Sequence, residues 1–166
     1  MNRPFKNNRS KRKPLAKKGS LPTEGILRFD QYVGDLAMQE TRSITVTTPE
    51  PGLPLGNYGF IEFYCADPTC DCRRAILHVC AEHSPGKTLA IIGYGWEDQQ
   101  FYIDWMRQDT EMSRNMNGAN LELMQPQSKY ANALLQVFKN VVMRDEAYLQ
   151  RLETHYALAK KKQGAK

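Results

Sequence analysis

Three of the chain's four cysteines, Cys65, Cys70 and Cys72, lie within a span of eight residues. They occupy the turn between two segments that have the composition of β-strands, so their sulfur atoms can meet across a short bend. Cysteine thiolates gathered in this way are typical ligands of structural Zn²⁺. The spacing Cys-x4-Cys-x-Cys therefore predicts a zinc site in which these residues are three of four tetrahedral ligands.

Two other interpretations of the cysteines stay open at this point: they are buried small side chains, or two of them form a disulfide. A bridge between Cys70 and Cys72 would be strained, because a single residue separates them. A bridge between Cys65 and Cys70 needs an oxidising compartment. The basic N-terminal stretch is not followed by an apolar segment, so it is not a secretory signal. We therefore expect a cytoplasmic protein with reduced thiols.

The fourth ligand must come from the remaining cysteine or the histidines. A straight strand rises ~3.3 Å per residue, which places His78 roughly 20 Å and Cys80 roughly 26 Å beyond Cys72. His83 follows Cys80 in a turn. His155 instead falls on the apolar face of the last predicted helix, which should pack against the sheet. We predict His155 as the fourth ligand, the alternative being an ordinary hydrogen-bonded histidine of the core.

Two arginines, Arg73 and Arg74, follow the last of these cysteines. Three thiolates and one imidazole around Zn²⁺ carry a net charge of about −1, which these side chains can offset while donating hydrogen bonds to sulfur. The alternatives are exposed arginines, or weak surface ion pairs with Asp67 and Asp71. Four protein ligands would leave no position for water, which favours a structural metal over a catalytic one.

The cysteine run and two later segments carry a resemblance to a known group of sequences. The chain resembles an uncharacterised bacterial family of small cysteine-motif proteins over residues 40–160. This resemblance implies that the three cysteines form a motif and that the pair His155 and Tyr156 belongs to the same pattern, and it implies no particular activity. The matching segments are Tyr-Cys-Ala-Asp-Pro-Thr-Cys-Asp-Cys-Arg-Arg (64–74), Tyr-Gly-Trp (94–96) and Gln-Pro-Gln-Ser-Lys-Tyr (125–130).

The elements that position the cysteines follow from hydrophobic periodicity. Alternating and β-branched segments predict a three-stranded antiparallel meander with one further strand, and apolar residues at helical spacing predict helices. The predicted fold class is α+β, a small antiparallel sheet packed by C-terminal helices and stabilised by zinc. The expected strands are 43–48, 58–64, 74–80 and 88–94, and the expected helices are 31–38, 97–108, one capped by Ser128 and one capped by Asp145.

The charge of the chain is unevenly distributed. Its net charge of +5 combines a basic N-terminus with an acidic body, because residues 24–159 hold eleven Lys or Arg against 18 Asp or Glu. At 166 residues and 41% hydrophobic content, one domain is expected. We predict a flexible basic arm at 1–22, a single zinc-binding domain at 23–162 and a basic tail at 163–166.

The basic arm is the strongest sequence indication of a partner. A flexible segment with eight cations and no acid attracts phosphate backbones through counterion release. We predict contact with RNA or a ribonucleoprotein; the alternatives are a solubility tail, a segment that folds back onto the acidic body, and attraction to a membrane surface. The predicted RNA-binding residues are Arg3, Lys6, Arg9, Lys11, Arg12, Lys13, Lys17 and Lys18.

Motifs of common catalytic sites are absent from the sequence. There is no glycine-rich phosphate loop, no His-Glu-x-x-His and no deaminase signature, and no orienting carboxylate accompanies His78 and Cys80. We therefore predict a non-enzymatic, zinc-stabilised module that binds RNA, for example on the ribosome. The alternatives are a protein-interaction adaptor with a structural zinc, and a zinc-dependent hydrolase.

Overall fold

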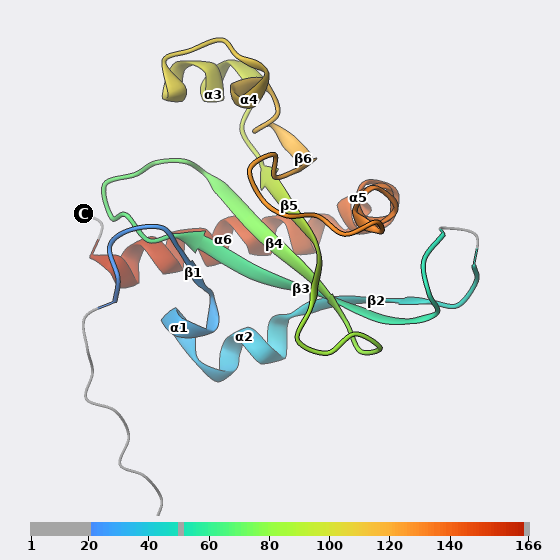
Figure 1. Cartoon of the computed structure of the whole chain (residues 1–166). Coiled ribbons are helices and arrows are strands. Elements are labelled where there is room, and N and C mark those ends of the chain that lie inside the picture. The colour runs from blue at the N-terminus through green and yellow to red at the C-terminus, as the bar shows by residue number, and fades with distance from the viewer. Residues whose placement is uncertain (1–20, 50–51, 165–166) are drawn as a thin grey trace, which may run out of the picture.

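The computed structural model describes residues 21–49 and 52–164 (Figure 1). In these ranges six strands and the helices that cover them follow one another along the chain. The strands are β1 (Ile26–Arg28), β2 (Arg42–Val46), β3 (Gly56–Cys65), β4 (Arg74–Ala81), β5 (Thr88–Gly95) and β6 (Gly118–Leu121). The helices are α1 (Asp30–Val33), α2 (Asp35–Glu40), α3 (Gln99–Met106), α4 (Glu111–Arg114), α5 (Ala131–Asn140), the 3₁₀ turn η1 (Val142–Arg144) and α6 (Glu146–Gln163).

All strand pairs of the sheet are antiparallel. The central meander runs β3-β4-β5, and β6 continues it beside β5. On the opposite edge β3 is long enough to pair with two strands, β2 along its first half and β1 at its last residues. The end of β3 that carries Cys65 therefore pairs with β1, since Ile26 lies opposite Cys65, whereas the pairing with β4 ends at Phe63.

The core lies between the sheet and the C-terminal helices. Residues of β3 alternate between buried and half-buried, and the buried ones face α5 and α6. The rings of Phe60 and Phe138 lie 5.5 Å apart, and the hydroxyl of Tyr64 donates to the backbone oxygen of Leu152 at 3.3 Å. Figure 1 shows α6 lying along one face of the sheet, while α3 and α4 extend beyond β5 and β6. Helix α6 is thus placed to reach the loop that joins β3 to β4.

The predicted α+β class, the meander and the additional strand are confirmed. The helix expected at 31–38 is two short helices, because Gly34 has a φ of 61° and interrupts the turn. Asp145 caps α6 as predicted, since its side chain accepts from the backbone N–H of Tyr148. Ser128 is not the N-cap of α5, because the helix begins at Ala131 and Tyr130 is its N-cap. The Ser128 hydroxyl instead accepts from the backbone N–H of Tyr130.

The N-terminal arm falls mostly outside the described residues. Its eight predicted RNA-binding residues all lie there, and so does Lys166 of the predicted tail. The last two residues of the arm belong to the folded body, because Leu21 packs against the core and the Pro22 oxygen accepts from the Gln163 amide at 3.0 Å. None of the helices in the described ranges is both long and apolar enough to cross a membrane.

Candidate metal centre

The loop between β3 and β4 brings three thiols together. Cys65 is the last residue of β3, and Cys70 and Cys72 lie in the eight-residue connection to Arg74. The three sulfur atoms all lie within 4.8 Å of one another, and all four cysteines of the chain are free thiols. Cys72 is buried, while Cys65 and Cys70 are half-buried. Three soft sulfur donors at this separation could hold a metal ion.

Local hydrogen bonds explain why the loop turns the cysteines toward one another. The Asp67 carboxylate accepts from both the backbone N–H and the hydroxyl of Thr69 at 2.8 Å, which is an Asx-type turn. The backbone N–H of Cys70 then donates to the Asp67 oxygen at 3.3 Å. At the other end, Arg73 has a φ of 47°, a left-handed conformation that non-glycine residues adopt infrequently. The chain thereby reverses direction directly after Cys72.

Two tyrosine hydroxyls hold this left-handed residue. The hydroxyl of Tyr102, from α3, donates to the Arg73 backbone oxygen at 2.8 Å. The hydroxyl of Tyr156, from α6, accepts from the Arg73 backbone N–H at 3.3 Å. Tyr102 is fully buried, and burial raises its pKa to about 12, so it remains a hydrogen-bond donor at neutral pH. Helices from two separate parts of the chain thus fix the backbone of Arg73, the residue that follows Cys72.

A buried lysine completes the surroundings of the thiols. Lys160 of α6 is only 8% exposed, and its Nζ donates to the Asp67 backbone oxygen at 2.6 Å. Its ammonium group also lies over the Tyr156 ring, 5.4 Å from the centroid. A buried cation requires an opposite charge or several acceptors. Negative charge on the neighbouring sulfur atoms meets that requirement.

The three thiols change one another's pKa through hydrogen bonds and charge. A hydrogen bond from Cys72 lowers the pKa of Cys65 to about 5 despite burial, and the charge of Lys160 lowers it further. The same hydrogen bond, together with burial, raises the pKa of Cys72. Burial is the main cause of the raised pKa of Cys70. Even without metal, the cluster therefore stabilises one thiolate, which is the form that binds cations.

Comparison with family models, curated proteins and solved structures finds no match to this chain. The structure supports one part of the resemblance drawn from the sequence, the cysteine motif. Cys65, Cys70 and Cys72 lie together as that motif implies. The function must accordingly be argued from the residues of this chain alone.

His155 does not join the thiols. It is buried on the sheet-facing side of α6, as expected, but both of its ring nitrogens contact carboxylates. Nδ1 lies 2.7 Å from Oε2 of Glu62, and Nε2 lies 2.6 Å from Oε2 of Glu40. The ring also stacks on Phe29, with the centroids 4.1 Å apart. The alternative interpretation, a hydrogen-bonded histidine of the core, describes this geometry.

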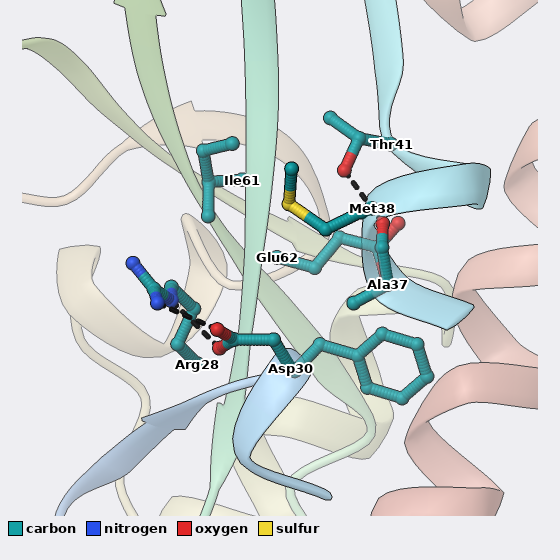
Figure 2. A pocket seen from close by; sticks show the side chains of 8 residues that line it. Arg28, Asp30, Ala37, Met38, Thr41, Ile61 and Glu62 are labelled. Carbon is teal, nitrogen blue, oxygen red and sulfur yellow. Dashed lines mark hydrogen bonds and ion pairs between the residues drawn. The ribbon is translucent and has the colours of Figure 1, made fainter. Parts of the chain in front are cut away.

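The carboxylate of Glu62 is the centre of this buried network. Figure 2 shows its side chain reaching from β3 toward α2, beside a cavity of about 120 Å³. Its Oε2 accepts from the Tyr64 hydroxyl at 2.7 Å as well as contacting His155.

The guanidinium groups of Arg73 and Arg74 form ion pairs with carboxylates. Arg73 pairs with Asp71 at 2.8 Å, which is one of the alternatives that the sequence left open. Arg74 pairs with Glu122 at 2.6 Å, a partner that the sequence did not indicate.

Sequence reasoning missed three residues around the loop, and each carried a signal. Glu62 occupies an inward position of an alternating strand, where a carboxylate needs a buried partner. Lys160 lies four residues after Tyr156, which extends the apolar stripe of the last helix by one turn. Tyr102 carried the weakest signal, because its hydroxyl meets Arg73 only through the tertiary fold.

Proposed function

We propose that this protein is a zinc-stabilised binding module in which Cys65, Cys70 and Cys72 hold one Zn²⁺. The observation that carries the proposal is the convergence of the three sulfur atoms within 4.8 Å. At a Zn–S distance of about 2.3 Å, tetrahedral geometry needs sulfur atoms ~3.8 Å apart, which small side-chain rotations in the loop can provide. The metal would join the end of β3 to the start of β4 beneath α6.

Metal analysis of the reduced protein tests the zinc site. We expect about one zinc per chain and a lower melting temperature with a chelator, because the ion binds only the folded loop. Cys70→Ser should lose the metal. Cys80→Ser is the matched control, since Cys80 is half-buried on β4 and lies outside the cluster. A wild-type protein without metal, whose melting temperature ignores the chelator, would contradict the proposal.

The binding partner we propose is RNA, contacted by the basic arm at 1–22. The support is the charge distribution: eight cations and no acid precede an acidic body. With all eight phosphate contacts made, affinity for a mixed-sequence single-stranded RNA should fall with salt at a log–log slope of about −5 to −6. Deleting 1–20, which leaves Leu21 and Pro22 of the folded body in place, should abolish this binding and flatten the slope.

A length-matched control separates charge from chain length in the RNA test. Replacing all eight arm cations by Gln keeps the arm and removes its charge, so binding should be lost as in the deletion. Cys70→Ser keeps the arm and should retain the salt slope while losing the metal. Full-length protein that does not bind RNA at moderate salt would contradict the RNA proposal.

Failure of the RNA test would leave the protein-interaction adaptor as the second candidate. The observation that favours it is a cavity of about 290 Å³ between α3, α4 and the segment after β6. Its walls include four methionines, a residue type that adapts to varied apolar partners.

The hydrolase alternative has less support, because Asp67 and Asp71 in the cysteine loop are engaged by Thr69 and Arg73.

A further inference from the structure

The sulfur and imidazole donors of this chain are few enough to be placed one by one. The chain has four cysteines and three histidines, and all seven lie within the described ranges. Three of them form the proposed zinc site, and structural zinc is almost always four-coordinate. The position of each remaining donor therefore decides where the fourth ligand comes from.

The donors on β4 and in the turn after it lie at the wrong end of the sheet. His78 pairs with Ile61 and Cys80 with Gly59, four and six residues before Cys65 on β3. At ~3.3 Å per residue these positions lie about 13 Å and about 20 Å from the cluster along the strand. His83 follows still further on, and its ring packs edge-on against Tyr58 with the centroids 5.5 Å apart.

His155 lies closer, but it is held in place by other groups. Both ring nitrogens contact carboxylates, at 2.7 Å for Glu62 and 2.6 Å for Glu40. Turning the ring toward the metal would leave Glu62, which is only 5% exposed, without its histidine partner. Leaving a buried carboxylate without such a partner is strongly destabilising. The two carboxylates of the cysteine loop, Asp67 and Asp71, are engaged by Thr69 and Arg73.

Resting on the proposed zinc site, we infer that the fourth metal ligand is a thiolate supplied from outside this chain. Cys65 and Cys70 are half-buried, so the metal would lie where an external group can reach it. Zn²⁺ with three thiolates carries a charge of about −1, and the Lys160 ammonium beside the loop offsets it. A further anionic sulfur is thus tolerated, and it matches the softness of the donors already present.

Cobalt substitution tests this inference without depending on any activity. The full-length protein is purified with a phosphine reductant, loaded with Co²⁺ and titrated with 2-mercaptoethanol. We expect a saturable shift of the visible d–d bands, because the small thiol replaces water as the fourth ligand. Cys80→Ser should respond as the wild type does when both are monomers, since the Cys80 sulfur is not a ligand within its own chain.

The source of the thiolate is decided by the oligomeric state of the loaded protein. A monomer whose spectrum shifts with 2-mercaptoethanol takes a small thiol or a partner's cysteine. A metal-dependent dimer that Cys80→Ser converts to a monomer takes the thiolate from a second copy of this chain. Both results support an external ligand.

Two results would overturn the inference while leaving the zinc site intact. One is a loaded monomer whose spectrum does not respond to excess thiol. The other is a folded His155→Gln variant with an altered cobalt spectrum, since that result would make His155 the fourth ligand. A protein that binds neither Co²⁺ nor Zn²⁺ would overturn the zinc proposal as well, so the two failures are distinguishable.

Discussion

The Nζ of Lys160 donates to the backbone oxygen of Asp67 at 2.6 Å, although 93 residues separate the two in sequence. This bond brings the last helix to the cysteine loop and places a cation beside the thiols. Lys160 is 8% exposed, whereas Lys161 and Lys162 are exposed on the same helix. The lysine run near the C-terminus thus contains one residue that faces the candidate metal centre.

Lys160→Met should weaken metal binding. The substitution removes the ammonium group and its hydrogen bond but keeps a long apolar side chain, so packing along α6 is largely preserved. Loss of groups that orient metal ligands typically costs 10–100-fold in affinity, and we expect about tenfold or more. Competition with a chromogenic zinc chelator measures the change. Lys161→Met is the matched control and should bind zinc as the wild type does; equal weakening in both variants would refute the role assigned to Lys160.

Tyr102→Phe should destabilise the loop through the backbone of Arg73. The substitution removes the 2.8 Å hydrogen bond to the Arg73 oxygen from a fully buried ring. Leaving the partly buried Arg73 carbonyl without its partner should cost about 1 kcal/mol or more of unfolding free energy. Urea denaturation of the zinc-loaded protein measures this loss. Tyr130→Phe is the control, because Tyr130 is half-buried and its hydroxyl makes no hydrogen bond within the described residues.

Gly93→Ala should disrupt the ion pair between Arg74 and Glu122. An added Cβ at Gly93 would lie 1.9 Å from Oε1 of Glu122 and 2.1 Å from Nη2 of Arg74, so one of these side chains must move. Overpacking of this kind costs about 1–3 kcal/mol. Gly59→Ala is the matched control in β3, because its added Cβ would meet nothing closer than 4.0 Å. Equal melting temperatures for the two variants would contradict the close approach of Arg74 and Glu122 to Gly93.

The parts of the fold predicted correctly from sequence are those that periodicity specifies. Strands β3 and β4 alternate over seven or more residues, β5 is a continuous buried run, and α6 carries a continuous apolar stripe. The strands β1 and β6 have three and four residues, too few for a periodic pattern. Their pairing is decided by neighbours distant in sequence, as when Ile26 meets Cys65.

The candidate site divides in the same way. The cysteine cluster was predictable because its spacing is local, within one turn between two strands. The environment of His155 was not, because its partners Glu62 and Glu40 come from β3 and α2 and are brought together only by the tertiary fold. A histidine on the apolar face of a helix therefore allows two interpretations, a metal ligand or a hydrogen-bonded residue of the core. The contact with the buried carboxylate of Glu62 favours the second.

The contacts of His155 give the last prediction, a pH dependence of stability. Burial opposes protonation of the ring, but the hydrogen bonds and charges of Glu62 and Glu40 outweigh burial and raise the pKa of His155 above its usual value. The charged ring is therefore favoured in the folded state. Its stabilising contribution is complete below about pH 6.5, the unfolded value, and is lost as the pH rises through the raised folded pKa.

Glu40→Gln tests this linkage and leaves the buried Glu62 in place. The substitution removes one of the two carboxylates that favour the charged ring, so the raised pKa should move back toward the unfolded value. Unfolding free energies from about pH 6 to about pH 9 should then decline less steeply with pH in the variant than in the wild type. Taking the difference between the two proteins at each pH cancels the titration of the thiols, which they share. Glu153→Gln, a half-buried position elsewhere on α6, serves as the charge-matched control. Parallel curves for the wild type and Glu40→Gln would show that His155 is not charged through this contact.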